Sequence, residues 1–181
     1  ERIHGSHLVF KHRDGRITLP PPRKPTGGRK PPPRLTAASA PREPLTVSER
    51  ALREITIHPI EDRKDSFLWN ELVERYHYLG YEPLPGAQIR YLVRWGPDHL
   101  AALGFGAAAW KVAPRDSFIG WTPQERQRNL RLIVNNARFL ILPWIEARNL
   151  ASRILSLAAK RLPQDWQIRY GYKPVLVETF V

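Results

Sequence analysis

The chain contains no cysteine, which excludes disulfide bonds, zinc ribbons and a thiol nucleophile. Methionine is absent as well, the initiator included, and the chain runs from Glu1 to Val181, ending inside an apolar stretch. These facts predict a fragment with residues missing at both ends. The apolar runs are shorter than the ~20 residues of a membrane-spanning helix, and no signal peptide is visible. We therefore expect a cytoplasmic protein without a membrane partner.

Basic residues are abundant, and they are unevenly distributed. The 29 Lys and Arg outnumber the 17 Asp and Glu, for a net charge of +12. Residues 1–50 hold eleven basic and four acidic residues (net +7), while residues 51–181 hold eighteen and thirteen (net +5). A hydrophobic fraction of 42% can build a core, so the chain is not wholly disordered. The charge indicates a polyanionic partner for the N-terminal part.

Residues 20–47 are predicted to form a basic, proline-rich linker. Triple prolines at 20–22 and 31–33 and a Gly pair at 27–28 favour an extended chain. Ahead of it, residues 9–19 are predicted to form a hairpin around Asp14 and Gly15. A basic strand of this kind suits the phosphates of DNA or RNA, although a hydrated tether would have the same composition. The candidate nucleic-acid contacts are Arg13, Arg16, Arg23, Lys24, Arg29, Lys30 and Arg34.

From about residue 48 the pattern is that of one packed domain. Alternating apolar residues predict strands at 54–59, 88–95 and 99–112, with Gly104 and Gly106 marking a bulge or the close approach of a ligand. Helices are predicted from Asp65 or Ser66 to about 79, from Thr122 to about 135, and from 147 to 162. Further strands are expected at 138–142 and 174–181. The order of these strands and helices predicts an α+β fold with three α/β/α layers, in which a β-meander is followed by a right-handed crossover connection.

Nine sequence motifs occur in an order and spacing typical of one family. They are YHYLG at 76–80, RYLV at 90–93, RD at 115–116, IGW at 119–121, NARFLILP at 136–143, NLAS at 149–152, DW at 165–166, RYGY at 169–172 and PVLVETFV at 174–181. Over residues 50–181 the chain resembles the DruA family of the Druantia anti-phage system, which also occurs fused to or near transposases. The segment GRITLPPPR at 15–23 is similar to the end of the helix-turn-helix-like region that precedes this domain in the family.

This resemblance implies DNA-associated anti-phage defence or a transposon-linked role, with other proteins of such systems as partners. It also implies a domain division into a helix-turn-helix-like remnant at 1–19, the linker at 20–47 and a DruA-type domain at 48–181, incomplete at its C-terminus.

The order of strands and helices at 54–181 resembles a GNAT acyltransferase fold cut before its last strands. That likeness implies an acetyl-CoA pyrophosphate site at the start of the helix that follows Pro143, with Arg148, Asn149 and Ser152 as cofactor-binding candidates. Ala147, Asn149 and Ala151 replace the small glycines of the GNAT loop, and Glu146 adds a negative charge. No cofactor is established by these residues. The alternative function is an acyl or aminoacyl transferase acting on a nucleobase or protein amine.

The candidate catalytic residues are His77, Asp116, Arg138 and Glu178. His77 suits a general base, or a core histidine stacked among aromatic rings. Asp116, next to Arg115 at a strand exit, suits a site or a salt bridge that holds the loop. Glu178, surrounded by apolar residues in a strand, needs a partner such as Arg138 or must face outward. Arg138 could also bind a phosphate.

Two other expectations concern metal sites and the residues just before the strand predicted at 138–142. His4, His7 and His12 lack neighbouring acids, so no metal site is expected. A two-metal nuclease would need a third acid beside Asp116 and Glu178, and none stands out. Asn136 is expected to end the preceding helix in a left-handed conformation.

Overall fold

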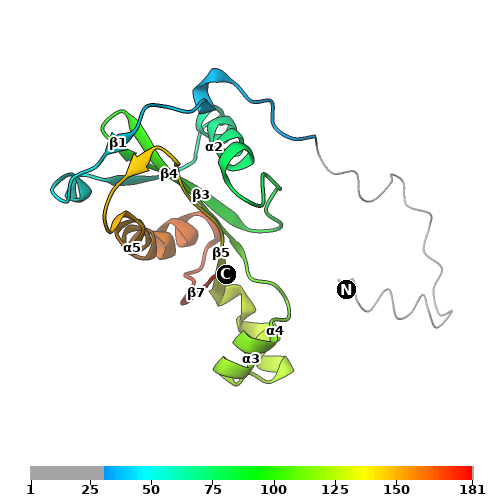
Figure 1. The fold of residues 1–181 in the computed structure, drawn as a ribbon. Helices are drawn as coiled ribbons and strands as arrows, with labels where there is room; N and C mark the ends of the chain where they lie inside the picture. The colour runs from blue at the N-terminus through cyan, green and yellow to red at the C-terminus, as the bar shows by residue number, and fades with distance from the viewer. Residues whose placement is uncertain (1–30, 181) are drawn as a thin grey trace. The chain divides into compact units, whose positions relative to one another are not determined.

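The computed structural model describes residues 31–180, and the chain divides into two units after Pro31. The predicted hairpin at 9–19 and six of the candidate contacts lie outside the described residues, namely Arg13, Arg16, Arg23, Lys24, Arg29 and Lys30. The second unit has an α+β fold, as predicted (Figure 1). Its five-stranded sheet has the order β2-β3-β4-β5-β7, and a two-stranded parallel sheet pairs β1 with β6.

The main sheet combines an antiparallel meander with one parallel pair. Strands β2 (Thr56–Pro59), β3 (Gln88–Trp95), β4 (Asp98–Ala107) and β5 (Ile133–Ile141) pair antiparallel in turn. The chain then crosses through helix α5 (Leu150–Tyr170) and returns as β7 (Leu176–Glu178), parallel to β5. The predicted meander and crossover are therefore confirmed.

Two helices cover the two faces of this sheet, which gives the three predicted layers (Figure 1). Helix α2 (Arg63–Tyr76) packs Trp69, Leu72 and Val73 against one face. Helix α5 packs a stripe at four-residue spacing, Leu150, Ile154, Ala158, Leu162 and Trp166, against the other.

Two short helices, α3 (Ala113–Ile119) and α4 (Pro123–Asn129), project beyond one end of the sheet (Figure 1). Thr122 and Glu125 form a capping box at the start of α4, as the sequence predicts. The remaining short elements are η1 (Ala37–Ser39), η2 (Ala51–Arg53), η3 (Leu130–Leu132), β1 (Leu45–Thr46) and β6 (Ile145–Glu146). Helix α3 and strands β1 and β6 were not predicted from the sequence.

Several predicted boundaries were wrong. Helix α2 begins a turn earlier than predicted, because Asp62 rather than Asp65 or Ser66 accepts the capping hydrogen bond. Strand β4 ends at Ala107, where α3 replaces the predicted continuation to 112. Helix α4 ends at Asn129, and β5 begins at Ile133 instead of 138. Helix α5 continues through Pro163, because the buried Trp166 extends its apolar stripe by one more turn.

Part of the predicted linker packs against the domain. The Glu71 carboxylate accepts hydrogen bonds from the Thr36 N–H (2.7 Å), the Thr36 hydroxyl (2.8 Å) and the Ser39 hydroxyl (2.9 Å). The Tyr76 hydroxyl donates to the Ser39 carbonyl at 2.8 Å. Residues 36–39 are thus attached to α2. The short polar side chains of this segment, and not its prolines, decide where the chain joins the domain.

Candidate functional site

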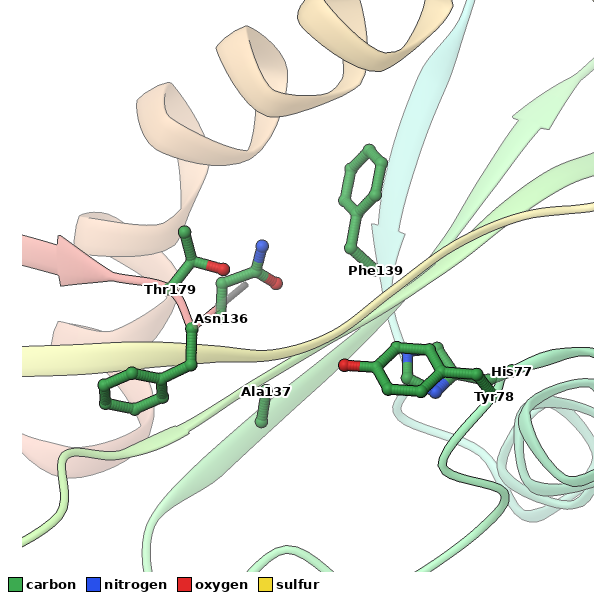
Figure 2. Close-up of a pocket in the computed structure, with 7 residues that line it drawn as sticks. His77, Tyr78, Asn136, Ala137, Phe139 and Thr179 are labelled. Carbon is green, nitrogen blue, oxygen red and sulfur yellow. The ribbon is translucent and has the colours of Figure 1, made fainter.

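A pocket of about 430 Å³ opens where β7 stops pairing with β5 (Figure 2). The β5–β7 ladder ends at Asn135 and Glu178, and a register shift leaves Ala137 unpaired against β4. Such a bulge re-aims the side chains on either side of it. The lining residues are His77, Tyr78, Asn136, Ala137, Phe139, Thr179 and Phe180, and we call this cavity the His77 pocket.

The predicted bulge lies at Gly104, opposite Arg138. A Cβ on Gly104 would lie 3.0 Å from Cζ2 of Trp69, so the backbone here is in close contact with an indole ring. The bulge prediction is confirmed, and the close approach is to the protein's own core.

His77 follows the last turn of α2 and is largely buried. Its ring stacks on Tyr78 with centroids 4.7 Å apart, and its Nδ1 accepts a hydrogen bond from the Leu79 N–H at 3.2 Å. Burial, together with the positive charge of Arg138, lowers the pKa of His77 below its ordinary value. The neutral ring therefore carries its proton on Nε2, which makes that nitrogen a hydrogen-bond donor. A general-base role would require the bond from Leu79 to break.

Two further polar side chains lie at the bulge. Asn136 sits inside β5 and is not in the left-handed conformation expected of a helix cap, so that expectation was wrong. Its Oδ1 is buried without a hydrogen-bond partner among residues 31–180. Arg138 is buried, donates from Nη1 to the Ala137 carbonyl at 2.7 Å, and leaves its Nε without a partner in the same part of the chain. The His77 pocket thus offers a donor and aromatic walls, whereas the Asn136 Oδ1 is buried behind its surface, and the pocket suits an uncharged polar ligand.

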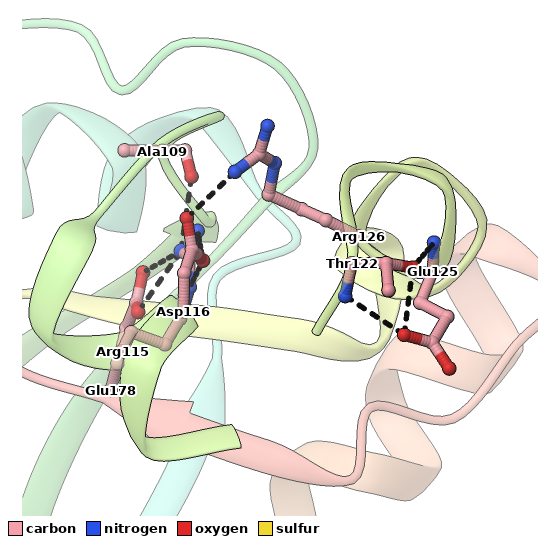
Figure 3. A network of polar contacts seen from close by, with 7 residues as sticks. All are labelled: Ala109, Arg115, Asp116, Thr122, Glu125, Arg126 and Glu178. Atoms are coloured by element: carbon pink, nitrogen blue, oxygen red, sulfur yellow. Dashed lines mark hydrogen bonds and ion pairs between the residues drawn. The ribbon is translucent and has the colours of Figure 1, made fainter. Parts of the chain in front are cut away.

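Asp116 and Glu178 belong to a separate network centred on Arg115 (Figure 3). Arg115 is buried. Its Nη2 lies 2.8 Å from the Asp116 carboxylate and its Nη1 lies 3.2 Å from that of Glu178. Nη1 also donates to the Ala109 carbonyl at 3.0 Å. The predicted pairing of Glu178 with Arg138 was therefore wrong, because β7 places its carboxylate beside α3 instead.

Arg126 of α4 completes the network by donating to Asp116 at 3.0 Å. Partial desolvation by itself would raise the pKa of Asp116. The hydrogen bonds from Arg115 and Arg126 outweigh it and hold that pKa below the ordinary value. The two acids and two arginines neutralise one another and join α3, α4 and β7. This arrangement agrees with the salt-bridge interpretation of Asp116.

The three cofactor candidates lie apart from the residues of the His77 pocket and from those of the network centred on Arg115. Arg148, Asn149 and Ser152 are exposed at the start of α5, and none of them lines the His77 pocket. Asn149 adopts a left-handed conformation (φ 61°) without capping the helix through its side chain. Its side chain stands where a GNAT loop has a glycine, and the exposed Glu146 carboxylate opposes an anion. These residues do not fit the pyrophosphate of acetyl-CoA.

Two residues that organise these contacts, Glu71 and Arg126, were not predicted from the sequence, and Arg115 was noted only as the neighbour of Asp116. The RD motif was visible at 115–116, but only the fold shows that Arg115 faces Glu178, 63 positions away. Within residues 31–180, no cluster of three or more His, Asp or Glu side chains could hold a metal ion. None of the helices described is both long and apolar enough to cross a membrane.

A comparison with protein families finds a match that spans most of the chain. The family described as Druantia protein DruA matches residues 37–181, so the chain belongs to that family. Membership assigns it to a Druantia anti-phage defence system. No curated protein and no solved structure matches the chain. The resemblance to a GNAT fold therefore stays a prediction.

Proposed function

We propose that this member of the Druantia protein DruA family binds DNA through the basic segment that precedes its folded domain. The observation that carries the proposal is the division of the charge: residues 1–50 contribute +7 of the net +12. Each phosphate neutralised by Lys or Arg releases a counterion, so a segment with seven spaced basic residues binds DNA in a salt-dependent way. A defence component that associates with DNA would be held close to invading phage genomes.

The attachment at Glu71 supports this proposal. Thr36 and Ser39 fasten the chain to α2 just after Arg34, the last of the seven basic residues. The folded domain therefore stays within a short tether of any DNA that the segment binds. Domain and DNA would then meet at a high effective concentration.

The test is duplex binding measured against salt by fluorescence anisotropy. One variant replaces Arg13, Arg16, Arg23, Lys24, Arg29, Lys30 and Arg34 with Gln. A matched control removes seven exposed charges of the domain instead, replacing Arg50, Arg53, Arg63, Lys64, Arg148, Lys160 and Arg169 with Gln. The slope of log K against log salt should fall by about 0.9 for each phosphate that a variant no longer neutralises. Equal slopes for the two variants would refute the role of the segment.

The family also supports partners among the other proteins of the same defence system, and we extend the proposal to proteins of a mobile-element system. Co-expression with those proteins and co-purification through a tag on this chain would test that part of the proposal. Failure of every one of them to co-purify with the full chain would count against it.

A second candidate function is group transfer in the His77 pocket, and the neutral donor in its lining favours it. His77 Nε2–H would donate to an acyl oxygen as an amine of a nucleobase or protein attacks. A bond forms between the amine nitrogen and the acyl carbon, the bond from that carbon to its carrier breaks, and the amine proton passes to water or to the departing carrier. Thermal shift with acetyl-CoA, aminoacyl esters and acyl phosphates tests the donor class.

A donor at about 100 times its Kd would stabilise the fold by about 2.7 kcal/mol. His77→Ala should abolish the stabilisation, whereas Arg148→Ala, at the exposed loop before α5, should leave it intact. No shift with any of these donors would argue against the transferase.

A further inference from the structure

A second pocket, of about 280 Å³, lies between the end of β4, helix α4 and the turn after α5. Trp110 and Tyr172 contribute aromatic walls, Gln127 and Arg131 contribute polar groups, and Ala107 and Ile133 are among the apolar residues that complete it. We call it the Trp110 pocket. Its volume lies just below the about 300–1,000 Å³ of drug-sized ligand sites, so it suits one flat ring system.

Arginines hold both aromatic rings of the Trp110 pocket. The Arg126 guanidinium lies 5.2 Å from the Trp110 ring centroid, and that of Arg131 lies 5.7 Å from the Tyr172 centroid. Arg126 is itself fixed by its ion pair with Asp116. Trp110 nevertheless remains 48% exposed. A large, oriented aromatic surface that stays accessible is a platform on which a planar ligand can stack.

The charge around the pocket is positive because basic residues outnumber the acids that are not ion-paired. Asp116 and Glu178 are paired with Arg115 and Arg126, while the Glu125 carboxylate, which accepts from Thr122 in the capping box, keeps its negative charge. Four exposed basic residues remain, and two of them directly follow the aromatic residues in sequence: Lys111, Arg128, Arg131 and Lys173. This surface attracts a polyanion.

We propose that the Trp110 pocket receives one unstacked base of a nucleic acid strand. The base would stack on Trp110 and Tyr172, the Gln127 amide would hydrogen-bond its edge, and the basic residues would contact the flanking phosphates. An acidic peptide would satisfy the charge but would leave the aromatic platform unused. The inference rests on the proposed nucleic-acid function and adds a contact, within the folded domain, that reads an exposed base.

The experiment uses the full chain and a single-stranded oligonucleotide carrying one 2-aminopurine, whose fluorescence responds to stacking. Trp110→Leu and Tyr172→Ala should each weaken single-strand binding about tenfold, the usual loss for one stacked base, and should abolish the fluorescence change. Arg131→Gln should lower the salt slope by about one. Phe118→Leu is the matched control, because Phe118 is an exposed aromatic residue of α3 that is not in the pocket lining. Thermal unfolding of each variant verifies that it is folded.

Unchanged affinity of the pocket variants, or an equal loss for Phe118→Leu, would overturn this inference. The variant in which the seven basic residues of the N-terminal segment are replaced with Gln tests the proposed function separately from the pocket inference. If that variant binds duplex DNA as the unaltered protein does, the proposed role of the segment fails. The pocket inference stands in that case only if Tyr172→Ala still weakens single-strand binding.

Discussion

The attachment of residues 36–39 to Glu71 yields a quantitative prediction about stability and pH. Three hydrogen bonds of 2.7, 2.8 and 2.9 Å converge on the same carboxylate oxygen. A hydrogen bond to a charged group contributes about 1.5–3 kcal/mol and a neutral one about 0.5–1.5 kcal/mol. Glu71→Gln therefore removes about 1 kcal/mol per bond. Because Thr36 is exposed and its bonds are partly screened by water, we expect a total loss of about 2 kcal/mol.

The pH dependence of this difference has a definite sign. Burial by itself would raise the pKa of Glu71, but the hydrogen bonds from Thr36 and Ser39 and the charge of Arg75 outweigh it and lower that pKa below 4.5. A carboxyl group with a lowered pKa in the folded state stabilises the fold fully above its unfolded pKa. That contribution disappears as the pH falls through the folded pKa, because a protonated Glu71 resembles Gln.

Urea unfolding followed by Trp fluorescence, repeated from pH 7 to below about pH 4.5, measures this difference. The gap between the unaltered protein and Glu71→Gln should be constant near neutrality and should narrow below about pH 4.5. Glu61→Gln, which alters an exposed carboxylate just before α2, should change stability by less than about 0.5 kcal/mol. A gap that does not change with pH, or no gap at all, would refute the reasoning.

Three further predictions concern the network, the bulge and the pocket. Arg115→Met leaves two carboxylates without their shared partner and should lower Tm by roughly 5 °C or more in calorimetry, whereas the exposed Arg128→Met should change it little. Gly104→Ala should cost about 1–3 kcal/mol in urea unfolding, because its Cβ meets Trp69 at 3.0 Å. Gly106→Ala meets nothing closer than 3.9 Å, so an equal cost would contradict this explanation. NMR titration of the His77 ring should give a midpoint below 6.5, and a midpoint above 6.5 would disprove its neutral state at pH 6.5.

Periodicity located most of the large elements of this fold. Strand β3 lies where alternation predicts it, and α4 begins at the capping box that Thr122 and Glu125 predict. These features are local, because a strand's alternation and a helix's first turn are set by residues within a few positions. The same local reasoning predicted that α5 ends before Pro163, because proline lacks a backbone N–H and its ring clashes with the preceding turn. The helix nevertheless continues, because Trp166 is buried one turn later, and that burial is a tertiary contact that local reasoning does not include.

The sequence predicted the individual candidate residues, but it did not predict which of them lie together in the fold. His77, Asp116, Arg138 and Glu178 were candidates from the sequence, and the fold separates them into a pocket at the bulge and an ion network beside it. Glu178 was unusual among apolar neighbours, which correctly indicated a need for a partner. The partner is Arg115, because β7 pairs with β5 in the register that brings Glu178 level with Asn135.

The amino-acid order alone established the lack of thiol chemistry, the basic N-terminal segment, the α+β class and the family resemblance. Each of these depends on composition or on neighbours in sequence. The tertiary structure alone decided which charges cancel and which stay exposed. Charges neutralise one another only when folding brings them within a few ångströms, as it does for Arg115 with Glu178, and no spacing along the chain encodes that distance.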